Sequence, residues 1–215
     1  MIKERKSVVS LGRCRVDRTV DIPISREGIR TTGTFISFQW RDNANVKEHF
    51  AIGLGDWKNV EIPTVRLHSE CMTGDVFNSE RCDCGDQLAE ALRVISECGG
   101  FVLYLRQEGR GIGLYNKFAA YRLQDEGYDT YQANEKLGFT HDLRNFDVAA
   151  DMLKALKANR IILHTNNDNK RRQLENEGIQ IEGILNTGVY EKDHNRYYLH
   201  AKQEVGGHSL KLKSI

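Results

Sequence analysis

Apolar side chains follow one spacing in the first third of the chain and another in the rest. In the first third they form short runs bounded by Asn, Asp or Gly, as in TFISFQW (34–40) and FAIGL (50–54). Such runs are typical of β-strands. The segment TVRLHSE (64–70) alternates apolar and polar residues, which also predicts a strand. The N-terminal third is therefore predicted to be rich in β-structure.

Further along the chain, helical patterns alternate with buried apolar runs. Leu88, Leu92 and Ile95 lie at helical spacing, and Gly99 can end that helix as its C′ residue. Further helices are predicted at about 114–126, 147–159 and 169–178, and buried strands at 101–106, 160–165 and 179–185. This alternation favours an α/β fold with some parallel pairing. We expect a layered mixed β-sheet with flanking helices and a β-rich N-terminal third.

Length and composition restrict the class of protein. A chain of 215 residues can bury a core without disulfide or metal staples. No long linker divides it, so residues 1–215 are expected to form a single domain. No apolar run approaches the roughly 20 residues of a membrane span, and the first ten residues, MIKERKSVVS, lack the apolar segment of a signal peptide. A cytoplasmic protein with no membrane partner is expected.

The charge of the chain is nearly balanced, with 31 basic and 30 acidic residues. A nucleic-acid-binding protein usually shows a basic excess or a basic stripe, so no nucleic-acid partner is expected. The positive charges lie in short clusters, such as Arg106 with Arg110, and residues 170–172. Such clusters suit a small anionic ligand.

Three of the five cysteines, Cys71, Cys82 and Cys84, lie within 14 positions. A disulfide is the least favoured interpretation, because disulfides are rare in the cytosol. A cluster of reduced core thiols is also disfavoured, because charged residues surround the cysteines. Thiolates are good zinc ligands, and three protein ligands with one open position are typical of catalytic zinc. His68, three positions before Cys71, could instead complete a closed structural site.

The segment EGRGIG (108–113) follows a predicted strand and precedes a predicted helix. Backbone N–H groups and the helix dipole hold phosphates at such positions, and the Arg110 guanidinium suits phosphate oxygens. A dinucleotide-binding loop and a plain structural turn remain alternatives, although the glycine spacing departs from the dinucleotide motif. Thr165 ends another predicted strand, where open α/β sheets bind ligands, and Lys170 is then free to reach a phosphate.

The motifs RLHSEC, TGD, RCDCG, YLRQEGRGIGL, LQDEGYDT, DLR and TNN together resemble the GTP cyclohydrolase II family of riboflavin biosynthesis. The resemblance is closest over residues 65–178. It implies a zinc-dependent hydrolase that opens the imidazole ring of GTP, releases C8 as formate and cleaves off pyrophosphate. The product would be a diaminopyrimidinone ribosyl phosphate. The resemblance also implies magnesium with the triphosphate, and a homodimer.

The resemblance implies roles for individual residues. Cys71, Cys82 and Cys84 would hold one zinc ion per chain, which activates the water that attacks C8. Asp142 would be the proton acceptor, Arg144 the nucleophile toward the α-phosphate, and Tyr121 a neighbour of the reacting base. GTP contacts are implied for Arg66, Leu67, His68, Ser69, Glu70, Gln87, Glu108, Gly109, Arg110, Thr130, Thr165 and Lys170.

Other interpretations of these residues stay open. Alone, Asp142 and Arg144 would be more typical of a surface ion pair. A guanidinium stays protonated and is a poor nucleophile, so Arg144 could instead clamp the leaving pyrophosphate. The residues beside the motifs depart from the family pattern at Asn78, Glu80, Asn145 and Asp168.

Two alternative functions stay open, and the departures bear on the first. The first is a paralogous zinc cyclohydrolase that acts on another nucleotide or gives a formylated product. The second is a non-enzymatic nucleotide-binding protein with a structural zinc, against which the intact glycine loop with Asp142 and Arg144 argues. In the C-terminal tail, Lys202 and His208 could close over a site.

Overall fold

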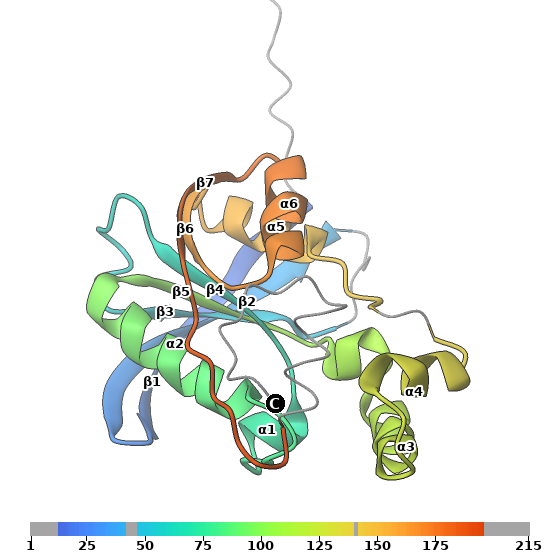
Figure 1. Ribbon diagram of the computed structural model, residues 1–215. Coiled ribbons are helices and arrows are strands. Elements are labelled where there is room, and N and C mark those ends of the chain that lie inside the picture. The colour runs from blue at the N-terminus through green and yellow to red at the C-terminus, as the bar shows by residue number, and fades with distance from the viewer. Residues whose placement is uncertain (1–12, 42–46, 140–141, 196–215) are drawn as a thin grey trace, which may run out of the picture.

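The computed structural model describes residues 13–41, 47–139 and 142–195, except the side chains of residues 130 and 131. Lys202, His208 and the side chain of Thr130 therefore lie outside the described residues. A seven-stranded sheet runs through the described part (Figure 1). Its strands are β1 (Cys14–Arg26), β2 (Ile29–Trp40), β3 (Phe50–Leu54), β4 (Thr64–Ser69), β5 (Gly100–Leu105), β6 (Arg160–His164) and β7 (Gln180–Leu185).

The helices lie between and around the later strands. They are α1 (Met72–Asp75), α2 (Cys84–Cys98), α3 (Leu114–Asp125), α4 (Thr130–Lys136), α5 (Asp147–Ala155) and α6 (Asp168–Asn176). The predicted mixed sheet with flanking helices is confirmed. Helix α5 ends before the predicted residue 159, because Lys157 adopts a left-handed backbone with φ of 60°. Within the described residues, no helix is both long and apolar enough to span a membrane.

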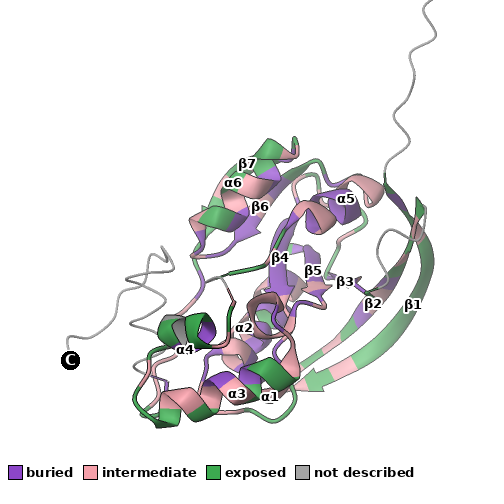
Figure 2. Cartoon of the chain, turned by 90° about the vertical axis from the view of Figure 1, so that its right-hand side faces the viewer, coloured by how far each residue is buried: buried purple, intermediate pink, exposed green. Residues whose placement is uncertain are grey.

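Helices cover both faces of the central strands. On one face, α2 packs Leu88, Leu92 and Ile95 against the β3 residues Ile52 and Leu54. On the other face, buried residues of α5 and α6 pack against β4, β5 and β6. Figure 2 shows the buried central strands β4 and β5 and, at the edge of the sheet, the mostly exposed strand β1. The core therefore lies around the strands that carry the site.

Strand β1 was not predicted from the sequence. It is an edge strand that pairs only with β2 among the described strands, and most of its residues are exposed. The strand does carry a short apolar alternation, at Val20, Ile22 and Ile24, but Val20 and Ile22 are exposed and Pro23 lies inside the run. Glu27 and Gly28 form the turn that joins β1 to β2. Glu27 and Gly28 both have positive φ, of 49° and 81°, as two-residue hairpin turns require.

The order of the strands creates a switch point at β4. The sheet runs β1-β2-β3-β5-β4-β6-β7, and the last four strands in this order are parallel. The chain passes from β4 through α2 to β5 on one side, then returns through α3, α4 and α5 to β6 on the other side. Open α/β sheets bind ligands outside the carboxyl ends of strands at such a point. The carboxyl ends of β5, β4 and β6 are thus the expected place for a site.

The pairing of β4 with β5 depends on a close approach at Gly100, which lies opposite Thr64. A Cβ added at Gly100 would lie 2.0 Å from the Thr64 carbonyl oxygen, and the φ of Gly100 is +149°. We predict that Gly100→Ala lowers the free energy of unfolding by about 3 kcal/mol or more, combining backbone strain with overpacking.

The matched control is Gly178→Ala. Gly178 also has a positive φ, of +82°, but a Cβ there would meet nothing within 4 Å. The Gly178→Ala variant should lose only about 1–2 kcal/mol of its free energy of unfolding to backbone strain. Urea denaturation of both variants measures these losses. Equal losses in the two variants would show that the approach of β5 to β4 is not tight.

Candidate active site

A cleft opens at the carboxyl ends of β4, β5 and β6. It brings together most of the residues singled out from the sequence: Arg66, His68, Ser69, Glu70, Cys71, Cys82, Cys84, Gln87, Glu108, Gly109, Arg110, Tyr121, Arg144, Thr165 and Lys170. Leu67 does not line the cleft, because its side chain is fully buried in the core. Asp142 contacts the cleft through its ion pair with Arg144.

Strand β4 supplies the floor of the cleft through its alternation. Successive side chains of a strand point to opposite faces, so Leu67 enters the core while Arg66 and His68 face the cleft. Arg66 is buried, and it donates to the Gln87 side-chain oxygen at 2.6 Å and to the His164 carbonyl at 3.2 Å. Gln87 in turn donates to Asp83 at 2.5 Å. The floor is thus a fixed polar surface.

The three cysteines converge at one end of the cleft. Cys71 follows β4, Cys82 lies in the loop after α1, and Cys84 begins α2. Their sulfur atoms all lie within 4.8 Å of one another, and the sulfurs of Cys71 and Cys82 are 3.6 Å apart. This is far from the disulfide length of about 2.05 Å, and all five cysteines of the chain are free.

The sulfur geometry fits a metal ion. Zinc–sulfur bonds of about 2.3 Å at tetrahedral angles place two sulfurs about 3.8 Å apart. Gly74 makes room for the cluster, because a Cβ there would lie 2.8 Å from the Cys82 sulfur. Hydrogen bonds from the Cys82 and Cys84 thiols lower the pKa of Cys71. A lowered pKa favours the thiolate, which is the form of cysteine that binds a metal ion.

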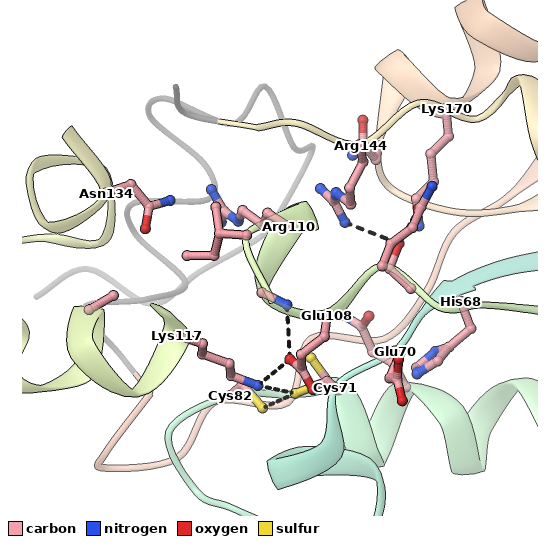
Figure 3. Close-up of a pocket in the computed structure, with 18 of the residues that line it drawn as sticks. His68, Glu70, Cys71, Cys82, Glu108, Arg110, Lys117, Asn134, Arg144 and Lys170 are labelled. Atoms are coloured by element: carbon pink, nitrogen blue, oxygen red, sulfur yellow. Dashed lines mark hydrogen bonds and ion pairs between the residues drawn. The ribbon is translucent and has the colours of Figure 1, made fainter. Parts of the chain in front are cut away.

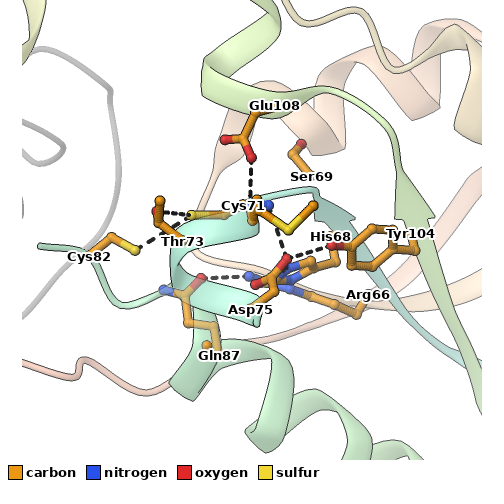
Figure 4. A network of polar contacts seen from close by, with 12 residues as sticks. Arg66, His68, Ser69, Cys71, Thr73, Asp75, Cys82, Gln87, Tyr104 and Glu108 are labelled. Atoms are coloured by element: carbon orange, nitrogen blue, oxygen red, sulfur yellow. Dashed lines mark hydrogen bonds and ion pairs between the residues drawn. The ribbon is translucent and has the colours of Figure 1, made fainter. Parts of the chain in front are cut away.

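His68 is held apart from the three sulfurs. Its Nε2 lies 3.0 Å from the Asp75 carboxylate, which also accepts hydrogen bonds from the Cys71 backbone N–H at 3.0 Å and the Tyr104 hydroxyl at 2.7 Å (Figure 4). Within the described ranges, no histidine, aspartate or glutamate joins the three cysteines as a fourth potential ligand. The geometry therefore favours an open site over a closed one in which His68 is a ligand.

The glycine loop after β5 has an unusual backbone. Arg110 adopts a left-handed conformation with φ of 60°, beside Gly109 with φ of 61°. A non-glycine residue in this region stores strain, which is common at ligand-binding sites. The Arg110 carbonyl accepts a hydrogen bond from the Leu143 N–H at 3.1 Å. This contact ties the loop to the segment that carries Asp142 and Arg144.

Glu108 and Lys117 connect the glycine loop to the cysteine turn (Figure 3). The Glu108 carboxylate accepts from the Met72 N–H at 2.6 Å and from the Gly109 N–H at 2.9 Å. The Lys117 Nζ donates to Glu108 at 2.8 Å and to the Cys71 sulfur at 3.1 Å. Burial opposes the charge on Lys117, but the Cys71 sulfur, Tyr121 and Glu108 raise its pKa.

Lys117 was not among the residues predicted from the sequence. Lys117, Ala120, Tyr121 and Gln124 all line the cleft from α3. Their spacing of three, one and three residues places them on one face of a helix. Because Tyr121 was already a candidate, this spacing could have identified Lys117 as its neighbour.

Asp142 and Arg144 form a close ion pair at the edge of the cleft. The guanidinium of Arg144 donates to both carboxylate oxygens of Asp142, at 2.9 Å from Nε and 2.6 Å from Nη2. Burial works against the charge on Asp142, but the hydrogen bonds from Arg144 lower its pKa. The Asp142 carboxylate is therefore stabilised in its charged form, and the Arg144 side chain is only 13% exposed. This favours a clamp for anions over a nucleophile.

Lys170 is not free, contrary to the expectation from the sequence. Its side chain is buried, and its Nζ donates to the Leu67 carbonyl at 2.7 Å. The ammonium also lies 5.4 Å from the ring centre of Phe146. Thr165 accepts the Asn167 N–H at 3.0 Å and is likewise buried. Both residues line the cleft as fixed parts of its wall.

Comparison with known proteins places these features in context. The sequence profile of a family described as GTP cyclohydrolase II matches residues 24–186. The chain is similar to GTP cyclohydrolase-2 of Vibrio vulnificus, with 57% identity over 152 residues, 71% of this chain and 77% of that relative. It is 54% identical to GTP cyclohydrolase-2 of Vibrio cholerae over 167 residues, 77% of this chain and 84% of that relative.

A longer relative matches almost the whole chain. The riboflavin biosynthesis protein RibBA of Bacillus velezensis is 46% identical over 212 residues, which are 98% of this chain and 51% of that relative.

His49 supports the start of the glycine loop and generates a pH prediction. Its buried ring accepts the Arg106 N–H through Nδ1 at 2.9 Å. Burial, with Lys47 and Arg106, lowers the pKa of His49 from 6.5 to about 4. Between these values the unfolded chain binds a proton that the native state lacks, so stability should rise with pH across this window.

We expect His49→Gln to remove on the order of 2 kcal/mol of that rise. The measurement is urea denaturation at several pH values between 4 and 7. His194→Gln is the control, because the His194 side chain is 72% exposed. If the stability of the His49→Gln variant depended on pH as that of the parent does, His49 would bind its proton as readily in the native state as in the unfolded chain.

Proposed function

The chain belongs to the GTP cyclohydrolase II family, and we propose that it is a hydrolase that opens the imidazole ring of GTP. The proposed products are formate, pyrophosphate and a diaminopyrimidinone ribosyl phosphate. The observation that carries the proposal is that the cysteine cluster and the glycine loop line one cleft. Base chemistry and triphosphate binding require these two features side by side.

We propose one zinc ion per chain at Cys71, Cys82 and Cys84. The sulfur separations support this, and so does the absence of a fourth potential ligand among the described residues. Bound there, zinc supplies Lewis acidity and lowers the pKa of a bound water to about 7. The chain must then hold the base at that end of the cleft and exclude competing water.

Polar groups on the floor support binding of the base. The Arg66 and Gln87 side chains are fixed by hydrogen bonds and lie in the same cleft as the sulfurs. A base with donors and acceptors on its edge can replace or extend such contacts. Tyr121 also lines the cleft, and burial raises the pKa of its hydroxyl. Tyr121 thus stays a neutral donor that can stabilise charge developing on the base.

The triphosphate is proposed to lie along the wall formed by Arg110, Arg144 and Lys170. All three cations line the cleft, and guanidinium groups bind phosphate oxygens in bidentate fashion. Magnesium is proposed to accompany the triphosphate. We propose that Arg144 clamps the leaving pyrophosphate and that Asp142 holds its guanidinium in place, because Arg144 donates to both carboxylate oxygens of Asp142. A charged guanidinium is a poor nucleophile.

Further parts of the proposal concern the molecule as a whole. We propose a single domain, a homodimer and a cytoplasmic location, with GTP as the partner and with no nucleic-acid or membrane partner. A single sheet through the described residues supports one domain. The second candidate is a paralogous cyclohydrolase acting on another nucleotide. It rests on the departures from the family pattern at Asn78 and Glu80, but neither residue lines the cleft. Asn78 contacts Arg26, at 3.4 Å, rather than the cleft.

Two variants separate the two halves of the proposed reaction. In the proposed order, pyrophosphate leaves before the ring opens. Arg144→Ala should therefore lose both products by about 100-fold or more while keeping its zinc. Cys82→Ser should lose zinc and formate together, because a three-thiolate site cannot spare a ligand, and should still release pyrophosphate slowly.

Paired quantitation of pyrophosphate and formate from GTP, with zinc content, measures these losses. Arg160→Ala is the matched control, because Arg160 pairs with Glu182 at 2.8 Å but does not line the cleft. If Arg144→Ala produced formate at the parent rate, ring opening would not depend on Arg144. Full formate release by a zinc-free Cys82 variant would rule out the proposed metal chemistry.

A further inference from the structure

Lys117 is a buried cation that makes three contacts with two segments of the site, the cysteine turn and the glycine loop. Only 8% of the residue is exposed. Its Nζ lies 3.1 Å from the Cys71 sulfur, 3.0 Å from the Thr73 hydroxyl and 2.8 Å from the Glu108 carboxylate. An ammonium group has three donors and no acceptor. These three contacts therefore match its full hydrogen-bonding capacity.

The charges around Lys117 require compensation. Three thiolates around a dication leave a net charge of −1, and the Glu108 carboxylate lies next to them. The proposed substrate is itself a polyanion. Like charges a few ångströms apart repel strongly where water is excluded. Lys117 is the cation in direct contact with both the Cys71 sulfur and Glu108.

The contact with sulfur distinguishes Lys117 from an ordinary buried ion pair. A lysine that served only to neutralise Glu108 would need no sulfur partner. A hydrogen bond to a coordinated thiolate withdraws electron density from sulfur and makes the metal a stronger Lewis acid. Three thiolates donate electron density strongly to a metal ion. Without such a hydrogen bond they would weaken its Lewis acidity. Groups around metal ligands tune metal centres in this way.

We propose that Lys117 is a positioning residue that restores the Lewis acidity of the metal centre through its hydrogen bond to Cys71. Through Glu108, whose carboxylate accepts from Met72 and Gly109, it also fixes the metal centre relative to the phosphate loop. This inference rests on the proposed function, because it requires a metal ion at the three cysteines. Lys117 itself does not touch the reacting atoms.

The test replaces the metal with Co²⁺, whose thiolate-to-metal charge-transfer bands report on the sulfur ligands. Lys117→Met keeps the length of the side chain but removes the hydrogen bond. We expect the charge-transfer band to move to lower energy, because sulfur without the hydrogen bond gives up electron density more easily. We also expect metal affinity to fall by about 10-fold or more. Arg122→Met is the control, because Arg122 is exposed on the same helix.

Two further variants keep the result interpretable. Lys117→Met leaves the Glu108 carboxylate buried without its cation, which can impair folding. The double variant Lys117→Met with Glu108→Gln removes that charge and should fold, yet should still show the shifted band. Lys117→Arg keeps a cationic donor and should return the band toward the parent position.

The outcomes separate this inference from the function on which it rests. A parent protein that binds no Co²⁺ at the cysteines would overturn both. A parent that binds one Co²⁺ per chain, with the same charge-transfer energy in the parent and in both Lys117→Met variants, would overturn the inference alone. A shift in the Lys117→Met variants but not in Arg122→Met would support it.

Discussion

One carboxylate, that of Glu108, links the cysteine turn of this site to its glycine loop. Glu108 accepts hydrogen bonds from the Met72 N–H at the cysteine turn and from the Gly109 N–H in the glycine loop, and it pairs with Lys117. A buried carboxylate with three donors is strongly constrained, because losing any donor leaves charge uncompensated. The distance between the three cysteines and the glycine loop therefore depends on Glu108. A substrate that must place its base at one end and its phosphates at the other can bind at both ends only if this distance is right.

The sheet explains why these parts can meet. Cys71 follows β4, Glu108 follows β5 and Thr165 follows β6, and the three strands are adjacent and parallel. Helices on both faces bury these strands, which supplies the rigidity that a preorganised site needs. The left-handed backbone of Arg110 shows where this rigidity imposes strain. Strands β1 and β2 extend the sheet at one edge but do not line the cleft.

Sequence patterns predicted the parts of the molecule whose signals are local. Buried strands, amphipathic helices and the residues just after strand ends were found because each leaves a short periodic or compositional trace. Strand β1 was not predicted, because its alternating Val20, Ile22 and Ile24 form only a short run with Pro23 inside it. Lys117 was missed because its sulfur partner Cys71 lies 46 positions away in the sequence. Lys170 lines the cleft, but its contact with the Leu67 carbonyl spans 103 positions and could not be predicted from the local sequence. Side-chain contacts of this kind join residues that are far apart in the sequence, so a local pattern does not predict them.

The central claim is that this cleft opens the imidazole ring of GTP with the aid of zinc. The most direct measurement is mass spectrometry and formate analysis after incubating the zinc-loaded protein with GTP, ITP, ATP and GMP separately. The account predicts one formate and one pyrophosphate for each GTP consumed, and a product that has lost C8. ATP should be left intact, because its base presents a different edge to the polar floor, and GMP should yield no pyrophosphate. Intact GTP after incubation with fully zinc-loaded protein, or ATP consumed as fast as GTP, would contradict the account.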